Sequence, residues 1–159
     1  MRVMRLIIAF AAAIIIPACI VTAWYLYSQF VTFESDDPYI VIRTRTFLLL
    51  CLTLAALHVV FLGIPGYFIL RWRNALRWWP IVLSGFVLGA MPCAFFSWPL
   101  QYRGMQTSAV VNGVETMING VPTVAGWLQF LGGVAFLGAC GVSGAAAFWL
   151  VQRPIGEAR

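Results

Sequence analysis

Long apolar stretches separated by short polar segments run through the whole chain. Four stretches carry no charged residue: Leu6–Phe33, Thr46–Leu70, Trp78–Tyr102 and Thr116–Gln152. Each exceeds the roughly 20 residues that an α-helix needs to cross a hydrocarbon layer about 30 Å thick. The pattern predicts an all-α polytopic membrane protein. We expect transmembrane helices over residues 6–30, 46–70, 79–100 and 125–151, packed as a bundle in a single membrane domain that spans residues 1–159.

The connections between these helices are short. We expect loops over residues 31–45 and 101–124 on one side of the membrane. A turn at 71–78 and a tail at 152–159 then lie on the other side. The first loop holds the acids Glu34, Asp36 and Asp37 beside Arg43 and Arg45. Exposed ion pairs of this kind contribute at most about 1 kcal/mol to stability. A solvated loop is therefore a simpler interpretation than a polar patch that binds a partner.

The loop at 101–124 carries the β-strand signals of the chain. Asn112-Gly113 and Asn119-Gly120 are hairpin-turn dipeptides that separate short segments at 108–111, 114–118 and 121–124. The loop predicts a small β-hairpin-like meander between the third and fourth spans. Two or three strands are marginal alone, so we expect it to pack on the helix ends. It is either a recognition surface or a plain cap; the candidate recognition residues are Asn112, Gly113, Glu115, Asn119 and Gly120.

Composition supports a lipid environment. The chain is 62% hydrophobic and 9% charged, against about 25% charged residues in a typical soluble domain. Its net charge of +5 comes from ten arginines that flank the apolar stretches singly or in small groups. That placement fits membrane boundaries rather than nucleic-acid binding, so membrane lipids are the expected surroundings.

The arginines also predict the orientation. Seven flank the side that holds both termini and the turn at 71–78, and three flank the opposite side. By the positive-inside rule both termini are cytoplasmic, in a bacterial inner membrane. The seven tryptophans lie toward the ends of the predicted spans, as in an interfacial aromatic belt.

The first span has an alternative interpretation as a cleaved lipoprotein signal, since the segment Ile16–Cys19 resembles the end of such a signal. The apolar run continues past Cys19, however, which favours a retained helix.

His58 is the candidate polar site inside the membrane. An ionisable group near the centre of a span is costly and is a functional candidate by default. The alternative is a neutral imidazole bonded to a neighbouring helix or to the carbonyl of Phe61, which Pro65 leaves without a donor. Met91 lies at a poorly matched depth for a second haem ligand, so we expect no cofactor. The candidate functional polar site comprises His58, Pro65 and Met91.

Small residues mark a helix-packing interface. Gly85 and Gly89 permit close approach of the third span, and every fourth residue of one stripe on the fourth span is small. That stripe comprises Ala135, Ala139, Ser143 and Ala147. The four cysteines show no metal-like or redox-like spacing and are interpreted as apolar fillers. A disulfide between Cys51 and Cys93 remains as the alternative.

Three segments of the chain carry a resemblance to a group of known proteins. They are Leu62-Gly63-Ile64-Pro65-Gly66-Tyr67, Gly85–Pro92 and Gly120–Trp127. With these glycine, proline and aromatic positions the chain resembles uncharacterised small four-span proteins of bacterial inner membranes. The resemblance implies the four-span threading and no particular activity.

The chemistry of most enzymes is missing from the sequence. No span contains Asp, Glu, Lys or Arg, and the chain shows neither a phosphate-binding loop nor a zinc-like spacing. We therefore expect a non-enzymatic membrane interaction protein. Its partner would be another membrane or envelope protein, in the manner of an accessory subunit or an immunity-type protein. The alternative is a homo-oligomeric small transporter or channel that uses His58 with kinks at Pro65 and Pro92.

Overall fold

The computed structural model describes residues 2–32 and 38–153, and most of them are helical. The helices are α1 (Arg2–Thr32), α2 (Ile40–His58), η1 (Val59–Gly63), α3 (Ile64–Trp72), α4 (Trp78–Phe96), η2 (Pro99–Tyr102) and α5 (Val124–Gln152). Because α2, η1 and α3 are continuous, the described residues contain four helical spans long and apolar enough to cross a membrane. These are Val3–Val31, Ile40–Trp72, Trp78–Tyr102 and Val124–Gln152. The prediction of four long apolar helices is confirmed.

The second span begins earlier than predicted. Helix α2 starts at Ile40, within the segment assigned to the loop at 31–45, so Arg43 and Arg45 lie on the helix. Ile40 is only 4% exposed, and burial of this side chain favours continuing the helix to that point. The acids Glu34, Asp36 and Asp37 lie outside the described residues.

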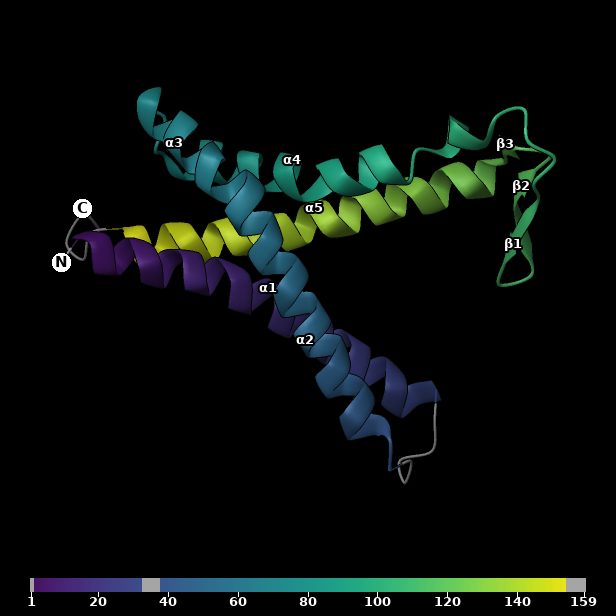
Figure 1. Cartoon of the computed structure of the whole chain (residues 1–159), viewed down its shortest axis with the longest axis horizontal. Helices are drawn as coiled ribbons and strands as arrows, with labels where there is room; N and C mark the ends of the chain where they lie inside the picture. The colour runs from purple at the N-terminus through teal and green to yellow at the C-terminus, as the bar shows by residue number, and fades with distance from the viewer. Residues whose placement is uncertain (1, 33–37, 154–159) are drawn as a thin grey trace.

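The helices form two arms that diverge from a common end (Figure 1). Helices α4 and α5 make the most extensive contact, and α1 packs against both α5 and α2. The first half of α1 runs beside the last half of α5, after which α1 and α2 turn away from the α4–α5 arm (Figure 1). The arrangement is therefore an open V rather than a closed four-helix bundle. We call the end that holds both termini and the α3–α4 turn the terminal end.

A small apolar core holds the terminal end together. Ala9, Ile81 and Phe148 are its buried members, with Phe10 and Tyr67 packed against them. The ring centroids of Phe10 and Phe148 lie 5.0 Å apart, and Tyr67 lies 5.9 Å from Phe10 and 5.6 Å from Phe148. Aromatic rings at such separations attract one another. This trio joins α1, α3 and α5 at the point where the two arms meet.

The α4–α5 contact depends on glycine. A Cβ atom built on Gly85 would lie 2.6 Å from the Gly141 carbonyl oxygen, and one built on Gly89 would lie 2.6 Å from the Leu137 carbonyl oxygen. Gly141 in turn faces the backbone of both glycines. Backbones this close leave no room for side chains, which is the packing predicted for Gly85 and Gly89.

The predicted meander is confirmed as a three-stranded antiparallel sheet in the order β1 (Ala109–Val111), β2 (Val114–Ile118), β3 (Val121–Pro122). Its turns place Asn112 and Asn119 at φ of 52° and 48°, each followed by a glycine with positive φ, as a type I′ turn requires. The Thr123 hydroxyl donates to the Glu115 carbonyl (2.7 Å) and accepts from the Gly126 N–H (3.2 Å). This cap fixes the sheet to the start of α5.

The glycine contact leads to a paired prediction. We expect Gly85→Ala to lower the free energy of unfolding by about 1–3 kcal/mol, because the new methyl group has to displace the backbone of α5. Gly132→Ala is the matched control, since its Cβ would meet nothing within 4 Å. Alanine also favours the helix there, by up to about 1 kcal/mol. Unfolding by SDS titration in mixed micelles measures both changes, and equal effects of the two variants would contradict the assigned contact.

Candidate functional site: an apolar cavity between the helices

A cavity of about 300 Å³ lies where the arms meet. Every span contributes to its wall, represented by Phe10 of α1, Leu54 of α2, Tyr67 of α3, Leu88 of α4 and Phe136 of α5. The described residues of this wall include no charged side chain. The cavity is partly open to the surroundings of the protein. It is therefore an apolar compartment that residues far apart in the sequence build together.

The wall of the cavity constrains what occupies it. Because the cavity is partly open, molecules from the surroundings can enter its roughly 300 Å³. A buried water molecule needs two to four polar partners, and this wall supplies few. Apolar matter is the favoured content.

His58 is the polar group of greatest interest on the wall. It is the last residue of α2, directly before η1, and it lines the cavity. Its Nε2 atom is buried and has no hydrogen-bond partner among residues 2–32 and 38–153. The bond to a neighbouring helix or freed carbonyl, considered above as the alternative for this histidine, is therefore not made at Nε2. Buried polar atoms are rarely left unpaired, so the atom calls for a partner from outside the chain.

A π-helical turn follows His58. The Ile64 N–H donates to the Val59 carbonyl, five residues earlier rather than four. Pro65 comes next and has no N–H to give to the Phe61 carbonyl, so the regular α-helical bond is unavailable there. The opening predicted before Pro65 takes this form, and π-helical turns occur frequently at functional sites.

The structure brings together only part of the predicted polar site. His58 lines the cavity, whereas Pro65 and Met91 are exposed and do not. Met91 of α4 is 47% exposed. Ser84 lines the cavity without any distinctive sequence signal, and Tyr67 was singled out only as part of the segment Leu62–Tyr67 that carries the resemblance. The small residues in several spans indicated close helix packing, but not that these helices would enclose a cavity.

The cysteines are all free, so the alternative of a Cys51–Cys93 disulfide is wrong. Cys51 and Cys140 both line the cavity. Cys93 lies instead beside Gly133 of α5, whose added Cβ would be 3.4 Å from the sulfur. Cys51, Cys93 and Cys140 occupy small, partly buried positions between helices, as the filler interpretation expects, whereas Cys19 is exposed and does not fit that interpretation.

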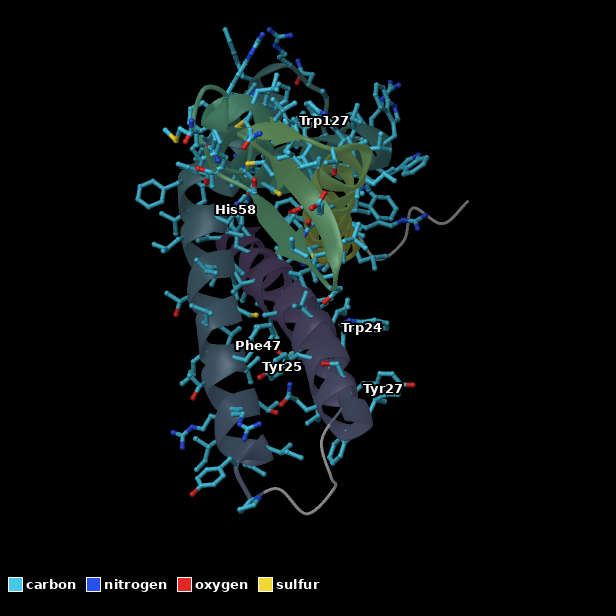
Figure 2. All side chains as sticks on the ribbon, turned by 90° about the vertical axis from the view of Figure 1, so that its right-hand side faces the viewer. Trp24, Tyr25, Tyr27, Phe47, His58 and Trp127 are labelled. Carbon is cyan, nitrogen blue, oxygen red and sulfur yellow. The ribbon has the colours of Figure 1, made fainter. Side chains whose placement is uncertain are left out.

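Further unpartnered polar atoms gather along the α1–α2 arm. Of the five buried side-chain polar atoms without a hydrogen-bond partner in the described part of the chain, four belong to α1 and α2. These four are Thr22 Oγ1, Gln29 Oε1, Thr44 Oγ1 and His58 Nε2. Tyr25 and Phe47, with ring centroids 4.1 Å apart, stack between the same two helices (Figure 2). The exposed Thr46 and Thr53 differ, since both hydroxyls donate to the carbonyl four residues earlier.

Helix α5 carries small residues on two faces. One face holds Gly141 and packs on α4. The other holds Ala135 and Ala139, which are exposed, and Gly132, around which an added Cβ would meet nothing within 4 Å. The remaining residues of the predicted stripe are covered to a greater degree: Ser143 is half-buried and donates to the Cys140 carbonyl (2.7 Å), and Ala147 is buried.

The two turns of the sheet differ in what they leave accessible. Gly120 is buried against the backbone of Tyr102 and Met105, and its N–H donates to the Thr107 carbonyl (2.8 Å). Asn119 is held by the Ser108 hydroxyl (3.2 Å). Asn112, Gly113 and Glu115 are exposed near the β1–β2 tip. Of the five predicted recognition residues, Asn112, Gly113, Glu115 and Asn119 are exposed and Gly120 is buried.

The unpaired Nε2 atom of His58 leads to a prediction about the stability of a variant that lacks it. For protein purified without added lipid, we expect His58→Leu to leave the free energy of unfolding unchanged or to raise it by about 1–2 kcal/mol, because a buried unsatisfied polar atom is replaced by hydrocarbon. Chemical unfolding in micelles provides the measurement. A loss above about 1 kcal/mol would mean that the imidazole makes a stabilising bond.

Comparison with known proteins gives no indication of function. The chain matches no known protein family, no curated protein and no solved structure. The function proposed below therefore rests on the residues of the chain itself.

Proposed function

We propose that the protein is a small integral membrane interaction protein without catalysis, which binds a second membrane or envelope protein through the uncovered face of α5. An accessory subunit and an immunity-type protein both fit this description. The observation that carries the proposal is the exposed position of Ala135 and Ala139 beside Gly132. These residues are on the helix that already packs on α4 with its other small-residue face.

Small exposed residues at helical spacing favour a helix as the neighbour rather than lipid. Association of helices in a bilayer depends on close packing, and Gly and Ala allow the two backbones to approach. The same chain demonstrates this at Gly85 and Gly141. On α1, by contrast, the exposed Ala11 lies between the bulky and exposed Ile8 and Ile15. The α5 face differs from that surface in the way a partner helix would require.

A second contact is available at the sheet. The β1–β2 tip projects from the end of the α4–α5 arm (Figure 1), and its exposed Asn112 and Glu115 offer polar groups beyond that end. A partner that lies along α5 and extends beyond the bilayer would meet both surfaces. Ordered loops on rigid scaffolds frequently carry recognition.

The proposal includes an orientation in a bacterial inner membrane. Both termini and the α3–α4 turn share one end of the molecule (Figure 1), and Arg71, Arg73 and Arg77 lie at that turn. The positive-inside rule assigns this terminal end to the cytoplasm and the sheet to the outside.

Affinity capture tests the proposal. We expect the tagged protein, solubilised from its own membranes in mild detergent, to recover one defined partner. Ala139→Leu should abolish recovery because the larger side chain prevents close approach. Ala11→Leu is the matched control, since it adds the same side chain to an exposed position of α1. Recovery of the tagged protein alone, or equal recovery with both variants, would rule the proposal out.

A homo-oligomeric transporter or channel is the second candidate. The observation that favours it is the group of unpartnered polar atoms on α1 and α2, which includes His58 at the cavity. Buried polar groups without partners are typical of sites that bind water or ions. The π-helical turn before Pro65, with Pro92 inside α4, provides local flexibility for such a path.

Flux through reconstituted vesicles distinguishes this second candidate. If it holds, His58→Ala should abolish a solute or proton flux that wild-type protein supports. Thr53→Val should leave that flux intact, because the Thr53 hydroxyl is engaged by its own helix. Absence of flux in wild-type vesicles, or flux that His58→Ala does not alter, would exclude the transporter.

A further inference from the structure

We propose that the cavity between the arms binds one neutral, single-chain lipid whose polar end group hydrogen-bonds with His58. The ligand site is separate from the α5 face of the proposed function. Its occupancy does not require a protein partner.

The wall chemistry selects a neutral hydrocarbon. Phe10, Leu54, Leu88 and Phe136 present apolar surface from four different helices. Among the wall residues that the structure describes, none is Asp, Glu, Lys or Arg, so a phosphate would be buried without an arginine or lysine beside it. That arrangement is strongly unfavourable. A phospholipid head group is thereby excluded, whereas an uncharged end group is not.

The volume selects a single chain. At about 300 Å³ the cavity lies at the lower end of the range for small-molecule pockets. It is about twice the size of a dry apolar cavity that accommodates benzene. One flexible chain fills such a space, and its partial opening lets the remainder of the chain extend into the bilayer.

One group on the wall needs a polar partner. The Ser84 hydroxyl is already engaged, since it donates to the Ile81 carbonyl at 2.8 Å. His58 Nε2 has no such partner within the described chain. A hydroxyl on the ligand can either donate to or accept from a neutral imidazole. The lipid end group therefore supplies the hydrogen bond that the protein does not.

Two glycines near α3 contribute helix backbone to the wall that faces the hydrocarbon chain of the ligand. Gly63, the last residue of η1, and Gly66 of α3 both line the cavity. Neither adds a side chain to the wall, and the Leu88 side chain packs closely on Gly66, with its Cδ1 3.1 Å from the position of an added Cβ. The wall after His58 therefore combines one polar group with backbone and apolar side chains.

Photo-cross-linking of the purified full-length protein tests the site with two matched probes. One is a hexadecanol and the other a hexadecane, each with a diazirine at the same carbon. We expect both probes to label cavity-lining peptides. The alcohol should bind about fivefold to tenfold more tightly than the alkane, because it satisfies a buried polar atom.

Variants distinguish labelling inside the cavity from labelling on the rest of the apolar surface. Ala55→Phe should reduce labelling of cavity peptides, because Ala55 lines the space. Ala56→Phe adds the same side chain at the next position, which does not line it, and should label as wild type. Leu88→Trp provides a second filling variant from α4. Size-exclusion profiles and circular dichroism identify correctly folded protein for each comparison.

The variant His58→Leu tests the hydrogen bond between the imidazole and the alcohol. In His58→Leu protein the alcohol and the alkane should bind equally well, while total labelling of the cavity remains. Labelling outside the cavity, equal labelling of the Ala55 and Ala56 variants, or an alcohol preference that persists in His58→Leu protein would each overturn the proposal. Ala139→Leu should not change lipid labelling, so a failure of the partner hypothesis is distinguishable from a failure of this one.

Discussion

The direct backbone contact between α4 and α5 is the constraint on which the rest of the structure depends. Helices of this length and hydropathy are suited to a bilayer, where lipid provides no hydrophobic force that drives apolar helices together and close packing has to hold them. Gly85, Gly89 and Gly141 provide it by bringing carbonyl groups and Cα atoms of the two helices into contact. This pair forms a rigid arm, against which α1 packs near the chain ends. The α1–α2 arm is then free to diverge, and the cavity forms where the two arms part.

Much of the architecture could be predicted because it depends on local signals. Uninterrupted apolar runs determine the four long helices, and the two Asn-Gly dipeptides determine the turns of the sheet. Both signals are short-range and independent of how the helices meet. The start of α2 was misplaced because Ile40 joins the helix through tertiary burial, which the flanking arginines conceal in the sequence.

The packing of the helices was harder to foresee. Small residues occupy several faces of α5, and the sequence does not distinguish those facing α4 from those facing outward. Gly141 meets α4, whereas Ala135 and Ala139 do not. His58 could be singled out because an ionisable residue in a span is costly. The remainder of the cavity wall is ordinary apolar sequence, and its convergence follows only from the angle between the arms.

The π-helical turn has a geometric consequence for this wall. In a regular α-helix, residues nine positions apart such as His58 and Tyr67 project about 180° from each other. Both nevertheless face the same cavity. The extra residue in η1 shifts the angular phase of the helix, so that Cys51, Leu54 and His58 before it align with Gly66, Tyr67 and Leu70 after it. No single helical wheel describes the second span, and the inserted turn converts two offset stripes into one continuous lining.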